Sequence, residues 1–124
     1  MPIHIQTLVK RADFQQIKAH GQRVSTQGFV VQYMPWPTPG LALGFTCSRA
    51  LGGAVARNRA RRRLKAAVDR AVRLNPSAQM GPQGVACVVV GKMPIFDIKF
   101  KHLIKDIQLA FTQVGVECPL SITT

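Results

Sequence analysis

GFTCSRALGGAVARNRARRRLKAAVDRAVR, residues 44–73, decides the fold. It contains the end of a predicted strand that begins at Leu41, then a turn, and then most of a long predicted helix. Over residues 41–47, large apolar side chains alternate with small ones, and this period of two is typical of a strand with one buried face. Gly52 and Gly53 then interrupt the pattern, and a helix is predicted from about Ala54 to Leu74. The helix ends there because the residue before Pro76 avoids the helical conformation.

The predicted helix divides into an apolar stripe and a basic face. The stripe recurs every three or four residues and consists mostly of alanine, which lets a helix lie close to a sheet: Ala56, Ala60, Leu64, Ala67, Val68 and Ala71. More than half of the chain's 17 basic residues lie within residues 49–73, opposed there only by Asp69. Like charges one turn apart cost about 0.2–0.5 kcal/mol per pair, so this face favours a polyanionic partner over bare solvent.

Outward from this stretch, the pattern predicts one domain of class α+β covering residues 1–124, with irregular ends at about 1–11 and 116–124. The other predicted elements are a helix over 12–20, a strand over 28–34, a proline turn over 34–40, a surface loop over 77–84, an apolar central strand over 85–90 and a last helix capped by Asp97. The last helix carries a predicted apolar stripe: Phe100, Leu103, Ile104, Ile107 and Phe111. We expect the helices on one side of a small mixed sheet, whose second and third strands are parallel.

Charge and composition narrow the classes of function. The chain has a formal net charge of +12 and a sequence pI of about 11.0, which is typical of a protein that binds nucleic acid. Its three cysteines show no metal-ligand spacing, and the odd count suits a reducing cytoplasm. We expect no secretion signal and no membrane span. The five carboxylates are scattered and no histidine partners a serine or cysteine, so no protein catalytic residue is expected.

Three kinds of polyanion partner remain open from the residues. An RNA partner suits the arginine-rich helix, since a guanidinium group grips phosphate with two bonds and stacks on bases. A DNA partner would place the helix in a major groove, but no two-helix turn or dimerisation element is found. A membrane surface would require large apolar residues opposite the basic face, where the chain has alanines.

The ordered residues around the helix start resemble one family. Gly44-Phe45-Thr46, Ser48-Arg49, Gly53-Ala54-Val55 and Arg57-Asn58-Arg59, followed by Arg61 and Arg62, are similar to the motif of the bacterial ribonuclease P protein. The resemblance extends over most of the chain, from Asp13-Phe14-Gln15 to the last helix. It departs from the family pattern at Lys18 and Gln32, where members often carry aromatic residues, and at Gly53, where asparagine is usual.

The resemblance implies a fold and two surfaces. The fold is a small two-layer α/β sandwich of about four strands and three helices, with a left-handed βαβ crossover, like the second domain of ribosomal protein S5. The first surface would bind the catalytic RNA through Arg49, Gly52, Gly53, Arg57, Asn58, Arg59, Arg61, Arg62 and Lys65. The second would be a cleft for the single-stranded 5′ leader of precursor tRNA, lined by Phe14, Lys18, Phe29, Val31, Tyr33 and Lys92.

The resemblance also implies a division of labour. The RNA subunit would perform the Mg²⁺-dependent cleavage that removes the leader, and the protein would hold no metal of its own. The expected partners are the ribonuclease P RNA and precursor tRNA, bound by a protein monomer in a 1:1 complex with the RNA in the cytoplasm. The alternative is another RNA-binding module, such as a ribosomal or assembly protein, with no part in cleavage.

Overall fold

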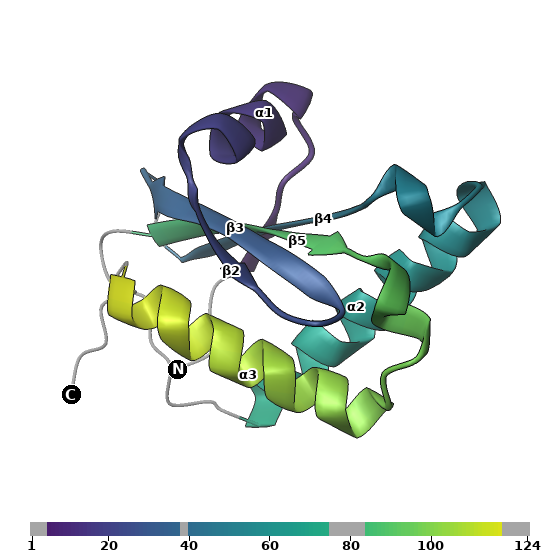
Figure 1. Ribbon diagram of the computed structural model, residues 1–124. Helices are drawn as coiled ribbons and strands as arrows, with labels where there is room; N and C mark the ends of the chain where they lie inside the picture. Colours follow the sequence, from purple (N-terminus) through teal and green to yellow (C-terminus); the bar gives the residue numbers. More distant parts are fainter. Residues whose placement is uncertain (1–4, 38–39, 75–83, 118–124) are drawn as a thin grey trace.

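A computed structural model describes residues 5–37, 40–74 and 84–117 of the chain. Its main elements are β1 (Ile5–Thr7), α1 (Arg11–His20), β2 (Gln22–Ser25), β3 (Phe29–Trp36), β4 (Leu41–Cys47), α2 (Ala54–Leu74), β5 (Gly84–Gly91) and α3 (Phe100–Glu117). Two short 3₁₀ helices, η1 (Arg49–Leu51) and η2 (Met93–Phe96), follow β4 and β5. The strands form one mixed sheet in the order β1-β4-β5-β3-β2 (Figure 1). The α+β class is confirmed.

Strand β5 is the centre of the sheet, as its uninterrupted apolar sequence predicted. It pairs in parallel with β4 from Leu41↔Val85 to Cys47↔Gly91, and antiparallel with β3 from Phe29↔Gly91 to Trp36↔Gly84. The parallel pair is joined through α2, because parallel neighbours need a long crossover connection. The predicted parallel pairing of the strands around residues 41–47 and 85–90 is thereby confirmed. The left-handedness of their crossover stays a prediction.

The two faces of the sheet carry separate apolar clusters. The larger cluster packs α2 and α3 against one face, and Val85, Cys87 and Val89 supply its β5 side chains. The smaller cluster packs α1 against the other face, with Ile17 at 0% exposure over Ala86 and Val88. Figure 1 shows α1 above the sheet and the two longer helices below it. The expectation that all helices lie on one side was wrong, because the central strands β4 and β5 are apolar toward both faces and need cover on both.

The sheet has five strands, where about four were expected. The sequence pattern located three of them, and the two that it missed are β1, which falls in the segment expected to be irregular, and β2, a polar edge strand. Neither strand shows the alternation of apolar and polar residues that predicts a strand, because β1 has only three residues and the side chains of β2 are mostly exposed.

Two expected boundaries were also wrong. Pro35 and Trp36 continue β3 instead of forming a turn. The pairing of β3 with β2 ends at Tyr33, so the missing N–H of Pro35 removes no hydrogen bond between these two strands. Asp97 does not cap the last helix, because it ends η2, where its N–H donates to the Pro94 carbonyl at 2.9 Å, and α3 begins at Phe100. The predicted loop over 77–84 and the tail after 117 lie outside the described residues, apart from Gly84.

Helix α2 has the predicted bounds, and its stripe is buried. Ala60, Leu64 and Ala67 are each 0% exposed, whereas Ala56, at the start of the stripe, is half-buried. No helix in the described ranges is long and apolar enough to cross a membrane.

Leu64→Ala is expected to lower the free energy of unfolding by about 2–5 kcal/mol, because it removes a large side chain from a closed part of the core. Urea denaturation followed by circular dichroism measures the change. Lys65→Ala, at the exposed neighbouring position, is the matched control and is expected to stay within about 0.5 kcal/mol of the parent. Equal losses in the two variants would contradict the burial assigned to Leu64.

Candidate RNA interface

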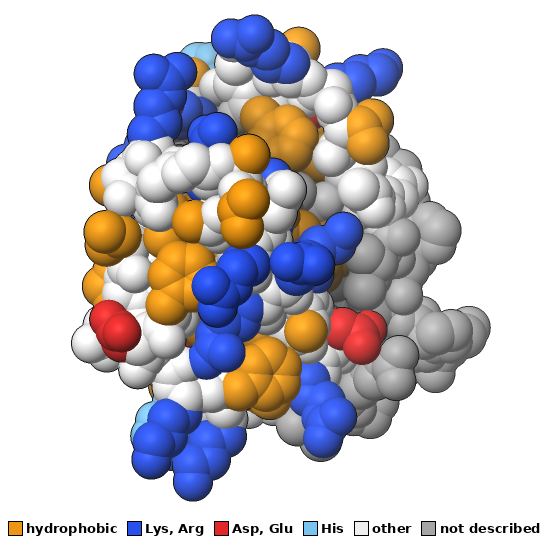
Figure 2. Space-filling view, turned by 90° about the vertical axis from the view of Figure 1, so that its right-hand side faces the viewer, with side chains coloured by type: hydrophobic (Ala, Val, Ile, Leu, Met, Phe, Trp, Pro, Cys, Tyr) orange, Lys and Arg blue, Asp and Glu red, His pale blue; other side chains and the backbone are white. Residues whose placement is uncertain are grey.

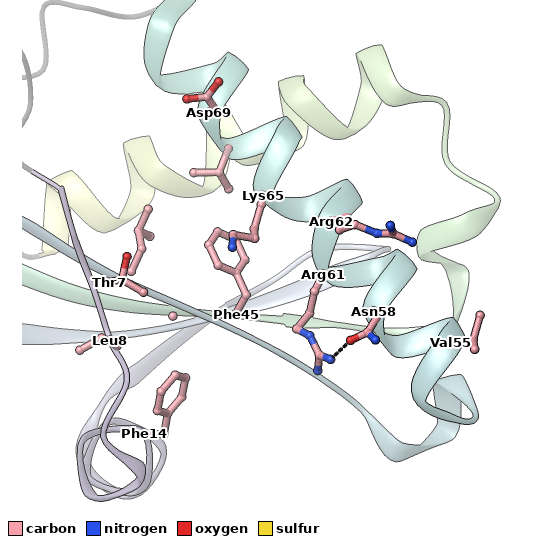
Figure 3. A pocket seen from close by; sticks show the side chains of 13 residues that line it. Thr7, Leu8, Phe14, Phe45, Val55, Asn58, Arg61, Arg62, Lys65 and Asp69 are labelled. Carbon is pink, nitrogen blue, oxygen red and sulfur yellow. Dashed lines mark hydrogen bonds between the residues drawn. The ribbon is translucent and has the colours of Figure 1, made fainter.

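An open pocket of about 730 Å³ lies between α1, the outer edge of β4 and the exposed side of α2. Phe14 enters it from α1, while Arg61 and Lys65 reach toward the same space from α2 (Figure 3). The complete lining is Thr7, Leu8, Phe14, Leu43, Gly44, Phe45, Val55, Asn58, Arg61, Arg62, Lys65, Val68 and Asp69. An aromatic ring therefore faces a row of basic side chains across one open space.

The floor of the pocket is the part of β4 that β1 leaves uncovered. Strand β1 pairs with Leu41–Leu43, and Leu8 adds one bond to the Leu43 carbonyl at 2.8 Å. Within the described ranges, no strand pairs with Gly44–Cys47 on the side away from β5. Gly44 and Phe45, which line the pocket, therefore offer backbone groups as well as a side chain to whatever occupies it.

Gly44 provides the space in which Phe14 lies. A Cβ atom placed on Gly44 would be 2.6 Å from both Cε1 and Cζ of the Phe14 ring, closer than any two such carbon atoms approach. The half-buried ring therefore lies directly on the backbone of β4 and leaves part of its surface open to the pocket. In the sequence, Gly44 is visible only as part of the family motif, and no pattern predicts its contact with Phe14.

The basic wall comes from one side of α2. Asn58, Arg61, Arg62 and Lys65 recur at helical spacing, and Arg61 donates a hydrogen bond to Oδ1 of Asn58 (Figure 3). This bond orients the guanidinium group toward the pocket and leaves most of its donors for a ligand. The structure thus places four of the nine predicted RNA-binding residues around a single cavity.

The turn before α2 is set by local constraints. The Ser48 hydroxyl accepts a hydrogen bond from the N–H of Ala50 at 3.2 Å and starts η1, and Gly52 ends it with φ of 111°, a conformation that favours glycine. Gly53 has an ordinary φ and open space around it. Of the two predicted glycines, Gly52 alone is demanded by the backbone.

Cys47 ties the end of β4 to α2. Its thiol donates to the Arg57 carbonyl at 3.5 Å, and burial raises the pKa of Cys47 even though the neighbouring Arg61 guanidinium opposes the rise. The thiol therefore stays protonated at neutral pH and acts as a donor inside the structure.

The other predicted RNA-binding arginines lie outside this pocket. Arg49 is exposed on η1, and Arg57 is half-buried with its Nε atom shielded from solvent. Arg59 extends over the Phe96 ring, with its Cζ atom 5.4 Å from the ring centre. The basic face of α2 is therefore wider than one groove.

The predicted leader cleft needs correction. Phe29, Val31 and Tyr33 are 0%, 0% and 2% exposed in the core beneath α2 and α3, so they cannot line a cleft beside α1. Alternate side chains of a strand point to opposite faces, which puts Val30, Gln32 and Met34 on the α1 side instead. Those three residues are half-buried.

The remaining cleft residues are dispersed. Lys18 is exposed on α1 and does not line the pocket. Lys92 lies at the end of β5, where its Nζ atom donates to the Ser25 hydroxyl of β2 at 3.2 Å. Of the six predicted cleft residues, Phe14 alone lies in the pocket with the α2 side chains. Thr7 and Leu8 also line it and were not predicted, because their place depends on how β1 pairs with β4. Phe45 lines it as well, where the alternation of β4 predicts a core residue.

Basic side chains dominate the surface around the N-terminal part of α2. Figure 2 shows them over this face from top to bottom, interleaved with apolar side chains, and with few acidic ones between them. Among residues 5–37, 40–74 and 84–117, no three His, Cys, Asp or Glu side chains gather as a metal site would require. The arrangement suits a polyanion that carries flat apolar groups.

Comparison with known proteins identifies the family. The sequence profile of the ribonuclease P family matches residues 4–115. The chain belongs to the ribonuclease P protein family. It is 32% identical over 120 residues to the ribonuclease P protein component of Paramagnetospirillum magneticum, covering 93% of this chain and 86% of the relative. It is 34% identical over 110 residues to the component of Gluconacetobacter diazotrophicus, with 88% and 90% covered.

Solved ribonuclease P proteins share the fold. The Staphylococcus aureus protein superimposes with a TM-score of 0.68 at 23% identity, over 89% of this chain and 95% of that one. The Thermotoga maritima protein gives a TM-score of 0.61 at 23% identity, over 88% and 94% of the two chains. The mixed sheet with its three helices is therefore the fold of the ribonuclease P family.

Gly44→Ala is expected to displace the Phe14 ring and to cost about 1–3 kcal/mol of stability, because the new methyl group overlaps the ring. Phe14→Leu removes the flat ring, so the Gly44→Ala/Phe14→Leu double variant is expected to lose less than the two single losses added together. Urea denaturation of the four proteins completes the cycle. Additive losses would show that the ring does not lie on Gly44.

Gly52→Ala and Gly53→Ala are expected to differ, although the two glycines are adjacent. The first forces a Cβ atom into a left-handed conformation and is expected to cost about 1–2 kcal/mol. The second meets nothing within 4 Å, but Gly53 is the N-cap of α2, where its carbonyl accepts from the Arg57 N–H at 3.0 Å, so only the poorer capping by alanine is expected to cost stability, by less than about 1 kcal/mol. Thermal denaturation measures both, and a larger loss in Gly53→Ala would contradict this backbone geometry.

Proposed function

We propose that this protein is the protein subunit of ribonuclease P, which binds the catalytic RNA and the 5′ leader of precursor tRNA and assists Mg²⁺-dependent removal of the leader. The observation that carries the proposal is the pocket in which Phe14 faces Arg61 and Lys65, with Arg62 at its rim (Figure 3). Family membership supports the same conclusion. The protein would act as a monomer bound 1:1 to the RNA, in the cytoplasm.

The basic wall suits the phosphate backbone of RNA. Each arginine or lysine that neutralises a phosphate releases condensed counterions, so affinity falls as the salt concentration rises. The charges on α2 repel one another in the free protein, and a bound polyanion would remove that repulsion. Asn58, held by Arg61, adds an amide group that can bond a base edge or a phosphate.

The opposite wall suits an unpaired strand. A single-stranded leader exposes the flat faces of its bases, and Phe14 offers a partly open ring on which one of them can stack. Stacking is tolerant of sequence, as a subunit that serves many precursor tRNAs would require. Val30, Gln32 and Met34 replace Phe29, Val31 and Tyr33 as the sheet residues we assign to the α1 side.

The cleavage chemistry is assigned to the RNA. The described carboxylates lie apart, and the described residues do not form a cluster that fits Mg²⁺. The metal would therefore be held by the RNA subunit, where it would activate water. The protein would contribute positive charge near RNA phosphates and added affinity for leader-bearing substrate over mature tRNA.

Arg61→Ala/Lys65→Ala is expected to abolish most of the protein's stimulation of leader cleavage at low Mg²⁺, and to weaken RNA binding by about 10- to 100-fold. The slope of log affinity against log salt should fall by about one to two, since two phosphate contacts are lost. Cleavage of a leader-bearing precursor tRNA by the ribonuclease P RNA, and binding titrations at several salt concentrations, measure these effects.

Arg23→Ala/Lys105→Ala removes the same charge from exposed positions on β2 and α3 and is the matched control. It is expected to keep nearly full stimulation. If the unaltered protein binds the RNA but does not stimulate cleavage at the mature 5′ end, the protein is an RNA-binding module of another kind. Equal losses in the two double variants would show that net charge, and not the pocket, is what matters.

A further inference from the structure

A second, smaller pocket lies on the other flank of the exposed side of α2. It measures about 310 Å³ and is lined by Arg59, Arg62, Arg63 and Phe96. Residues of a helix are spaced about 100° apart, so Arg62 lies on the ridge between the two pockets and lines both. The second pocket faces η2 and the start of α3, whereas Phe14 belongs to the first.

Phe96 lines this second pocket, and two further apolar side chains close to it in the chain are also partly exposed. Phe96 and Phe100 are 38% and 37% exposed, and Met93 nearby in the chain is 58% exposed. The periodicity of α3 placed Phe100 in the core stripe, but Phe100, the first residue of the helix, is covered only in part, whereas Leu103 one turn later is 0% exposed. Exposed large apolar groups beside a binding surface commonly mark a place where a partner docks.

The arginines at the pocket are arranged in pairs with these rings. The Cζ atom of Arg59 lies 5.4 Å from the centre of the Phe96 ring, and that of Arg63 lies 5.7 Å from the centre of the Phe100 ring. Arg63 also donates a hydrogen bond to the Ile98 carbonyl, so it is fixed in the wall of the pocket. Its Nε atom is buried and, among the described residues, has no hydrogen-bond partner.

Resting on the function proposed above, we propose that this pocket binds an unpaired nucleotide of the ribonuclease P RNA, whose base stacks on Phe96 while Arg59 and Arg62 contact its phosphates. No acidic side chain lines the pocket, which favours an anionic partner. The exposed ring favours a partner with a flat apolar face, and an RNA nucleotide outside a helix combines both properties. The pocket lies away from Phe14, which favours the RNA subunit over the leader as the source of the nucleotide.

Replacement of the ring separates stacking from charge. Phe96→Leu keeps an apolar side chain but removes the aromatic face, and it is expected to weaken binding of the full-length RNA by about 5- to 100-fold. Because no phosphate contact is lost, the salt dependence of binding is expected to stay unchanged. Phe96→Tyr, which keeps a ring, is expected to bind like the parent protein.

Phe111→Leu is the matched control, because it makes the same substitution at a site outside the pocket that packs against the core, and it is expected to bind the RNA like the parent protein. The inference is overturned if Phe96→Leu binds the RNA as tightly as the parent protein, or if its affinity falls together with the salt slope. The second result would mean that Phe96 merely positions Arg59 on a phosphate.

Photocrosslinking gives a readout that does not depend on affinity. With p-azidophenylalanine at position 96, we expect a crosslink to one or a few unpaired nucleotides of the RNA subunit in the full complex with precursor tRNA. The same probe at Leu109, which is 62% exposed on α3, is the control and is expected to give none. A crosslink to the leader alone, or no crosslink in a complex that still stimulates cleavage, would overturn the inference and leave the proposed function intact.

Discussion

The burial of one side of α2 is the condition on which the rest of the structure depends. Arginine and lysine crowd the exposed side of this helix, and their mutual repulsion would favour its unfolding. Ala60, Leu64 and Ala67 on the opposite side of the helix are fully buried, and the packing of this stripe against the sheet and α3 stabilises the helix. Packing of the buried stripe therefore keeps the basic side chains on a folded helix, and the small alanine side chains allow the helix to lie close to the sheet.

The sequence allowed the central elements to be predicted because their signals are strong and local. The apolar stripe and the Asn75-Pro76 stop defined α2, and the run of valines defined β5. The arrangement around them depends on long-range choices. A ten-residue amphipathic helix such as α1 does not encode which face of the sheet it will cover, and a three-residue strand such as β1 is set by its partner and not by its own pattern.

The candidate site was predictable to the same extent. Basic residues on one helix face are visible as a spacing, so the sequence predicted that Arg61, Arg62 and Lys65 lie together, and the structure places them around one pocket. Phe29, Val31 and Tyr33 were misplaced because alternation separates the two faces of a strand without saying which helix covers each one. Gly44 contacts Phe14, and Phe96 contacts Arg59. The members of each pair are distant in the chain, so no local sequence pattern predicts these contacts.

The open edge of β4 has a consequence for the free protein. A strand edge with unmatched backbone groups is a template on which a second copy of a chain can add, and Gly44–Cys47 is such an edge among the described residues. Arg61 and Lys65 line the same pocket as this edge, and a net charge of +12 drives copies apart. At physiological ionic strength this repulsion reaches only about 8 Å, so it acts where two edges would meet. The charge that would recruit a polyanion thus also opposes the pairing of two free copies at this edge.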